Sequence, residues 1–188
     1  MKDEFARVSG ALLSLLRDGL SPWPLAARED IALASPAGIG GDCRMGVFLY
    51  DLQDHTEVSP AQLRYTEAGR RVPPPVPFAL SYMLFCSEGQ AFGGRDPAEA
   101  HALLSAAVAA VNGNRSLCLA EQEEPVALSF ARLPLATKVQ LWSSFQKPMQ
   151  PAVFLVAAPV YADLRQPEPL PPVRQVRVHG KRREEAGR

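Results

Sequence analysis

The sequence PFALSYMLFC at residues 77–86 decides the expected fold, because apolar and aromatic side chains occupy almost every position. This composition is typical of a β-strand. A strand without an alternating polar side has no face for water, so we predict a central place in a sheet. The stretch from Arg44 to Leu52 is similarly continuous and predicts a second strand that is buried on both faces.

Two helices are predicted to cover this sheet. In residues 5–20, apolar side chains recur every three or four positions, which indicates a helix with one apolar face that ends near Gly19 and Pro22. Asp96 is a helix cap followed by Pro97 at the first helical position, so a second, alanine-rich helix is expected from Ala98 to Val111, before Asn112-Gly113. We expect both helices on one face. The stripe of the first helix consists of Phe5, Val8, Leu12, Leu15, Leu16 and Leu20.

The remaining segments carry weaker signals. We expect a strand at 28–33, a half-buried strand at 125–133, a short helix at 136–145 and a last strand at 152–162. In the last strand Pro159 marks a sheet edge or a bulge. Residues 53–76 are polar, proline-rich and without a period, and they predict a long loop.

The order α, β, β, β, α, β, α, β defines an α/β or α+β domain. We expect a mixed, mostly antiparallel sheet of about four to five strands with two or three helices. Residues 1–163 form this domain, whereas 164–188 form a proline-rich basic tail that is either disordered or docked on a neighbouring subunit. From Asp163 onward the chain has seven Lys/Arg against four Asp/Glu. The order of the strands does not follow from the sequence.

Composition narrows the class of protein. Lys and Arg number 20 and Asp and Glu number 20, so the chain has no net charge that favours nucleic acid or an anionic membrane. No signal peptide or membrane-spanning run is visible, so we expect no membrane partner. The three cysteines, Cys43, Cys86 and Cys118, form no metal or disulfide pattern and favour a reducing cytoplasm.

No catalytic or metal-binding motif stands out. His55, His101 and His179 are far apart in the sequence, and Asp51, Asp54, His55 and Glu57 match no loop geometry that holds a metal. The glycine clusters at 38–42 and 89–96 are interpreted as connections. We therefore predict a non-enzymatic protein without cofactor or metal. A small hydrolase that uses Cys86 or Cys118 remains an alternative hypothesis.

Two segments are candidate interaction sites. In the tail, residues 173–178 alternate in character, and Arg174, Val176, Arg177 and Val178 predict a strand that adds to the sheet edge of a neighbour. The basic tail also leaves a nucleic-acid-binding adaptor open as an alternative, although no aromatic residue is interleaved there.

The second segment is the short helix and its end. Trp142 and Phe145 are three positions apart and share a helix face, while Pro148 ends the helix. The pair either anchors the helix to the sheet or forms a contact between subunits, where tryptophan is enriched. Gln146 and Lys147 are the expected exposed contacts.

The sequence LWSSFQKPM at 141–149, followed by AVFLVAAPVYAD, resembles the N-terminal domains of tail-terminator or cap proteins of extracellular contractile injection systems. These belong to the Photorhabdus virulence cassette and antifeeding prophage group. The first helix, VFLYDL at 47–52, PFALSYMLF at 77–85 and the alanine-rich helix also fit, so the resemblance covers about residues 3–163.

The resemblance implies a tail-terminator-like fold and a structural role. It implies a homo-oligomeric ring, a hexamer, that sits on the last layer of inner tube and sheath. Such a ring stops polymerisation and anchors the sheath, without covalent chemistry, in a particle that assembles in the cytoplasm and can be released. A different tail-completion or neck protein is the structural alternative.

Overall fold

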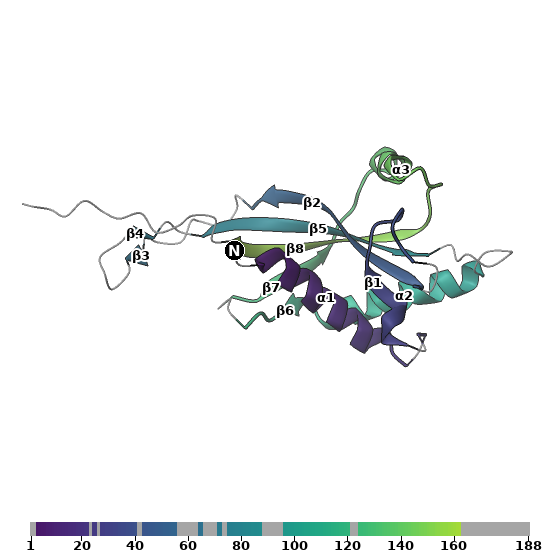
Figure 1. The fold of residues 1–188 in the computed structure, drawn as a ribbon, viewed down its shortest axis with the longest axis horizontal. Helices are drawn as coiled ribbons and strands as arrows, with labels where there is room; N and C mark the ends of the chain where they lie inside the picture. Colours follow the sequence, from purple (N-terminus) through teal and green to yellow (C-terminus); the bar gives the residue numbers. More distant parts are fainter. Residues whose placement is uncertain are drawn as a thin grey trace, which may run out of the picture.

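The computed structural model describes residues 3–22, 24–25, 27–40, 43–55, 64–65, 71–72, 75–87, 96–120 and 124–162. Six strands form one sheet in the order β1-β2-β5-β8-β7-β6 (Figure 1). The strands are β1 (Ile31–Leu33), β2 (Met45–Asp54), β5 (Val76–Cys86), β6 (Ser116–Leu117), β7 (Val126–Phe130) and β8 (Ala152–Ala162). Only β1 and β2 are parallel neighbours.

This architecture confirms the expected α+β class, the mostly antiparallel sheet and the central place of β5. The sheet has one strand more than expected, because β6 has only two residues and so produces no periodic signal. At the other edge, residues 28–30 form a 3-10 turn, η1 (Arg28–Asp30), so the strand predicted at 28–33 is reduced to β1.

The loop predicted at 53–76 is wrong in part. β2 continues to Asp54 and β5 begins at Val76. Between them, β3 (Arg64–Tyr65) and β4 (Arg71–Val72) pair as a separate antiparallel two-stranded sheet, which Figure 1 shows beyond one end of the main sheet. Two-residue strands are held by pairing rather than by a side-chain pattern, so sequence periodicity does not reveal them.

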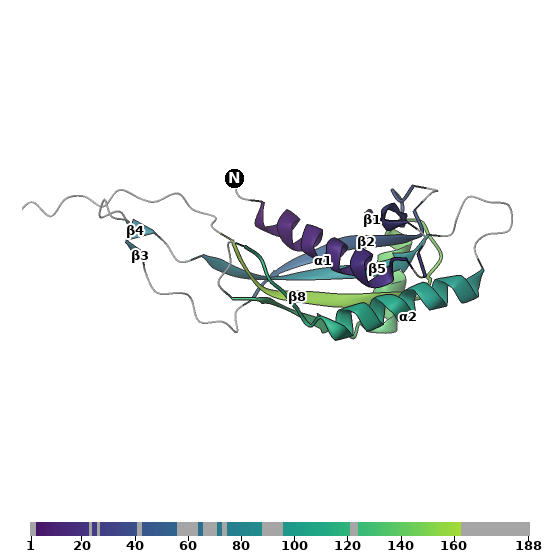
Figure 2. The ribbon, with the colours of Figure 1, turned by 90° about the horizontal axis from the view of Figure 1, so that it is seen from below.

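Three helices cover the two faces of the sheet. The helices α1 (Glu4–Leu20) and α2 (Pro97–Gly113) lie together on one face, as expected, and α3 (Leu135–Ser144) lies on the other (Figures 1 and 2). None of the helices in the described ranges is both long and apolar enough to cross a membrane.

The main core lies beneath α1 and α2. It combines the predicted stripe of α1 with one face of α2 and with alternate residues of the central strands. Gly19 lies inside α1 rather than at its end, because the helix continues to Leu20. A Cβ atom at Gly19 would lie 2.5 Å from Cβ of Ala110, so the glycine allows the close approach of the two helices. Buried residues of this core include Val8, Leu12, Leu16, Leu20, Leu80, Tyr82, Leu84, Leu103, Ala107, Val111, Leu155, Ala157 and Val160.

Two strands differ in detail from the prediction. Burial on both faces holds for Met45–Val47 of β2 but not for the end of the strand, where Leu52 is exposed. In β8, Pro159 marks a bulge and not an edge. The strand pairs with β5 on one side and β7 on the other, and its register shifts between the partners Phe78 and Leu80.

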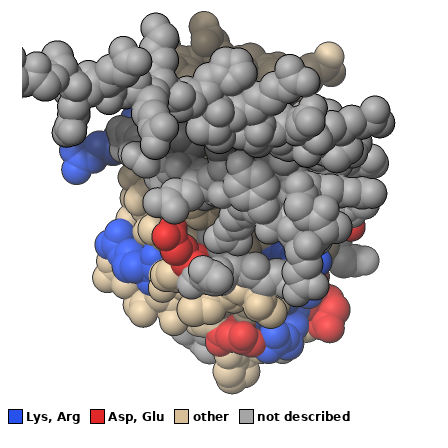
Figure 3. Space-filling view, turned by 90° about the vertical axis from the view of Figure 1, so that its left-hand side faces the viewer, with Lys and Arg blue, Asp and Glu red and all other residues tan. Residues whose placement is uncertain are grey.

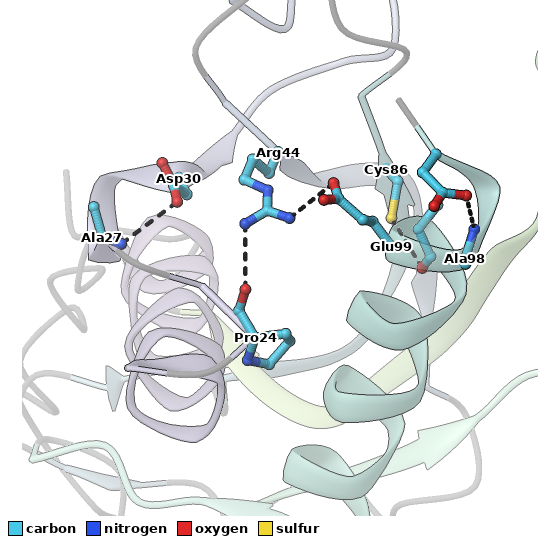
Figure 4. A network of polar contacts seen from close by, with 9 residues as sticks. Pro24, Ala27, Asp30, Arg44, Cys86, Ala98 and Glu99 are labelled. Carbon is cyan, nitrogen blue, oxygen red and sulfur yellow. Dashed lines mark hydrogen bonds and ion pairs between the residues drawn. The ribbon is translucent and has the colours of Figure 1, made fainter. Parts of the chain in front are cut away.

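Arg44 joins four parts of the fold (Figure 4). Its guanidinium donates to the Pro24 carbonyl and to Glu99 Oε2, each at 3.2 Å. Its backbone N–H donates to the Asp30 carbonyl at 2.7 Å, and its carbonyl accepts from Ser87 N–H at 2.9 Å. One residue thus links the α1–β1 connection, the start of β2, the end of β5 and the first turn of α2. The predicted cap of α2 is also confirmed, because Asp96 Oδ1 accepts from Ala98 N–H at 2.9 Å.

Tyr82 carries the one buried phenol that faces α1. Its hydroxyl lies 2.8 Å from Ser9 Oγ, which is itself 2.9 Å from the Phe5 carbonyl. Burial raises the pKa of Tyr82 to about 12, and the hydrogen bond with Ser9 offsets part of the rise. The folded protein therefore holds the phenol proton to a higher pH than the unfolded chain, in which tyrosine titrates near about 10.

We predict that this proton makes stability fall between about pH 10 and 12, by up to about 1.4 kcal/mol per pH unit. In that window the unfolded chain has lost the proton and the folded protein has kept it. Urea unfolding at pH 8, 10 and 11.5 should show a steeper loss for the native protein than for Tyr82→Phe. The variant should lose about 1 kcal/mol at pH 8, from the hydrogen bond alone. Equal pH dependence in both proteins would show that the Tyr82 proton does not cause the loss of stability.

Candidate functional site

The helix α3 forms the candidate site because it is the least buried helix of the domain. In Figure 1 it is seen end-on above strands that run across the view, so it lies across the sheet rather than along it. Among its residues, only Trp142 is fully buried. Most of its surface therefore faces away from the protein.

Two aromatic pairs attach α3 to the sheet. Trp142 packs edge-to-face on Phe85 with ring centroids 5.9 Å apart, and Phe145 packs edge-to-face on Phe48 at 5.3 Å. Trp142 is 2% exposed. This geometry agrees with the anchoring interpretation of the pair. A role of either ring in contacts between subunits stays a prediction, and for Trp142 it would need the helix to move.

Phe85 takes this position because of a glycine on the neighbouring strand. Gly46 pairs with Phe85 in the register of β2 and β5, and the phenyl ring lies over the glycine. A Cβ atom at position 46 would overlap the ring. The glycine therefore gives Phe85 the space that it needs to meet Trp142.

Three large apolar side chains on α3 and just after it are exposed. Leu135 is 66% exposed, Val139 44% and Met149, just after the helix, 48%. Leu135 and Val139 are four positions apart and so adjoin on the helix surface. The sequence prediction did not include this pair, although Leu135, Val139 and Trp142 follow the i, i+4, i+7 spacing of one helical stripe.

The stretch of sequence that contains α3 carries only basic charges. From Pro125 to Ala162 the chain has three basic residues, Arg132, Lys138 and Lys147, and no acidic residue. Lys138 Nζ lies 5.5 Å from the centre of the Phe154 ring, where the cation adds to the anchoring of the helix. The end of the molecule in Figure 3, in contrast, mixes Lys and Arg with Asp and Glu among its described residues. Exposed apolar side chains in a stretch of chain with basic charges alone suit an acidic, partly apolar partner.

The turn after α3 presents Gln146 in a left-handed conformation, with φ of 56°. Gln146 N–H donates to the Ser143 carbonyl at 3.0 Å, and Lys147 N–H donates to the Trp142 carbonyl at 3.3 Å. These two bonds form a Schellman motif, which ends the helix before Pro148 is reached. Glycine is the usual residue at this position. Gln146 is exposed, as predicted, while Lys147 is half-buried.

The remaining residues that the sequence proposed as sites form no second candidate site among the described residues. Arg174, Val176, Arg177 and Val178, like the tail and its boundary near residue 163, lie outside the described residues. The same is true of Glu57, His179 and most of the glycine cluster at 89–96. Within the described ranges, no three His, Cys, Asp or Glu side chains form a group that could hold a metal ion.

Of the two cysteines in the hydrolase alternative, Cys86 lies in the protein interior. Cys86 is buried, and its Sγ lies 3.5 Å from the Ala100 carbonyl, to which it donates (Figure 4). A buried thiol of this kind behaves as a small apolar side chain. Cys118 is exposed.

Fold and surface together define an α+β sheet domain with one short, largely exposed helix. The family model of the Pvc16 N-terminal domain matches residues 7–175. Because this match spans most of the 188 residues, the chain belongs to the Pvc16 N-terminal domain family.

Two solved structures share the fold. One is the sheath/tube terminator of an extracellular contractile injection system, PVC, in its extended state, with TM-score 0.64 and 18% identity over 96% of this chain. The other is the tube-terminating cap of the anti-feeding prophage, AFP, with TM-score 0.62 and 19% identity over 92% of this chain. This chain spans 65% and 60% of those two proteins. A search of curated proteins gives no match.

We predict that Gly46→Ala loosens α3. The added methyl group displaces Phe85, and overpacking of this kind costs about 1–3 kcal/mol. In a Trp23→Phe background Trp142 is the only tryptophan, and its fluorescence emission should shift to the red. Gly10→Ala is the matched control, since a Cβ atom there meets nothing within 4 Å. An unchanged emission in Gly46→Ala would show that the Phe85–Trp142 contact does not depend on the glycine.

We also predict that Gln146→Gly stabilises the domain by about 0.5–1 kcal/mol. The left-handed conformation costs a residue with a side chain about 1–2 kcal/mol, and glycine avoids this cost. Part of the gain in stability is lost because glycine has greater freedom in the unfolded chain. Chemical denaturation measures the difference. Lys147→Gly, one position later, should give no such gain. A lower stability of Gln146→Gly would contradict the strain at this turn.

Proposed function

We propose that this chain is a structural subunit that terminates the tube and sheath of a contractile injection system. The observation that carries the proposal is the shared fold over nearly the whole chain with a sheath/tube terminator and a tube-terminating cap, together with membership in the family. The subunit acts by binding, without catalysis, cofactor or metal. Its site of action is the end of a phage-tail-like particle that assembles in the cytoplasm and can be released.

The exposed apolar residues of α3 support a docking role. Leu135, Val139 and Met149 expose three large apolar side chains on α3 and just after it, which is costly in water unless another protein covers them. Gln146 occupies a strained turn that glycine would fill with less strain, so the side chain is a candidate for a contact with a partner. In this proposal α3 binds the tube or sheath, and Gln146 and Lys147 extend the contact.

The subunits close into a ring, which we propose to be a hexamer. A closed ring needs two different surfaces on each subunit that fit each other. The tail at 164–188 is proposed to supply one of them by docking on the neighbouring subunit. Membranes are not expected partners, and nucleic acid is not favoured.

The test compares a pair of exposed apolar residues on α3 with one exposed apolar residue on α2. Leu135→Ser with Val139→Ser should reduce co-sedimentation with assembled tube and sheath by tenfold or more, because it removes the centre of the proposed patch. The control is Val108→Ser on α2, which is also partly exposed but lies on the other face of the sheet. This control should bind like the native chain, and both variants should keep the native melting temperature within a few degrees.

Gln146→Gly adds a second readout. A docking role predicts weaker co-sedimentation despite higher stability, a combination that a purely structural role does not produce. The function itself is refuted if the native chain stays monomeric in analytical ultracentrifugation at all concentrations, with and without sheath and tube proteins. Electron microscopy of particles without this subunit separates a terminator, whose loss gives over-long tails, from a neck protein, whose loss does not.

A further inference from the structure

The outer edge of β2 is only partly used. β1 pairs with Met45–Val47 and Ala34 N–H donates to the Val47 carbonyl, but in the described part of the chain no strand continues alongside residues 48–54. His55 N–H points inward, to the Pro77 carbonyl at 2.9 Å. Because backbone groups alternate along a strand, those of Leu52 and Asp54 point outward. An unpaired edge of this kind is a template for another strand.

A hollow of about 270 Å³ lies where β1 stops and this edge begins. It is lined by Leu33, Val47 and Leu49, with Ser9 and Tyr82 among the remaining residues. One water molecule needs only about 30 Å³, so a branched aliphatic side chain has room there. Leu33, at its rim, is 48% exposed.

Asp51 holds the edge in its unpaired state. Its Oδ1 accepts from Leu52 N–H at 2.9 Å, and its Oδ2 accepts from the Gln53 amide at 2.6 Å. The carboxylate thus satisfies a backbone donor that a partner strand would otherwise bind. Pairing with a strand would free this carboxylate for a cation.

We propose that residues 173–178 of a neighbouring copy add to this edge as an antiparallel strand. The inference rests on the proposed function, since it names the surface that receives the tail in the ring. The register follows from charge and from the bulge at Tyr50, where the β2–β5 pairing also skips one residue. It pairs Arg174 with Asp54, Val176 with Leu52, Arg177 with Asp51 and Val178 with Leu49.

Side-chain direction supports this register. Leu49 packs toward the core beneath α1, and Leu52 pairs with the buried Leu80 of that core, whereas the register shift turns Asp51 to the opposite face. In a strand, Val176 and Val178 share one face and Arg177 lies on the other. The two valines then meet the leucines and the hollow, while Arg177 meets Asp51.

The length of chain before residues 173–178 allows this segment to reach a neighbouring copy. Ala162 pairs with Val76 and Asp54 pairs with Phe78, so β8 and β2 end at the same end of the sheet, two strand spacings or about 10 Å apart. Residues 163–172 contain four prolines, and proline-rich sequences extend about 3.1 Å per residue, or about 30 Å here. This reach is about three times the gap within one copy and suits a site on the next.

Charge reversal in the full chain tests the register. Arg177→Glu and Asp51→Lys should each weaken association between copies by about three- to tenfold, and the double variant should recover it to within about twofold. Arg183→Glu, outside the segment, is the control for the charge of the tail. Val176→Pro should abolish the pairing, because proline lacks the N–H that a strand donates. Sedimentation velocity measures the association.

Hydrogen exchange locates the contact. The outward amides of Leu52 and Asp54 should be protected in the native chain at high concentration and lose that protection on dilution or in Val176→Pro. Protection that is independent of concentration would mean that the tail folds back on its own chain and would overturn the proposal. The proposal would also be overturned if the double variant Arg177→Glu with Asp51→Lys associated no more tightly than either single variant. If the chain still binds tube and sheath in those cases, the edge contact fails and the terminator function stands.

Discussion

The fold depends on the alternation of side chains along β5, a central strand that contributes to both layers of the domain. Leu80, Tyr82 and Leu84 enter the core beneath α1 and α2, while Met83 and Phe85 form the cluster beneath α3. Because successive residues of a strand point to opposite faces, a shift of one residue would exchange the two sets. The bulges of β2 and β8 adapt their own registers to β5, so the central strand is the reference for its neighbours.

The two layers are stabilised unequally, and this difference creates the proposed docking surface. Two long helices bury a continuous apolar core on one face, whereas α3 is attached through Trp142 and Phe145 with the help of Lys138. A short helix that is attached through two aromatic residues leaves much of its surface exposed. Leu135, Val139 and Met149 remain partly exposed beside this attachment, and exposed apolar residues of this kind are typical of a surface used in assembly.

The unpaired edge of β2 also suits a protein that assembles with others. Proteins that act alone block unpaired edges with bulges, charges or short strands. Here β2 carries a bulge and two aspartates along the unpaired stretch, and Asp51 bonds to the backbone of Leu52. These features prevent indiscriminate pairing, yet they also select a strand with arginines at the matching positions. Specific assembly and resistance to aggregation can therefore come from the same residues.

The sequence by itself determined the α+β class, the central strand, the two covering helices and the capped start of α2, because periodicity and capping are local properties. It also indicated Trp142 and Phe145 as a pair, through their helical spacing. Tertiary structure alone decided the strand order, the position of α3, the ring of Phe85 over Gly46 and the unpaired edge beside Leu33. Each of these joins residues that are distant in the chain, and such contacts depend on which elements pack together rather than on any local pattern.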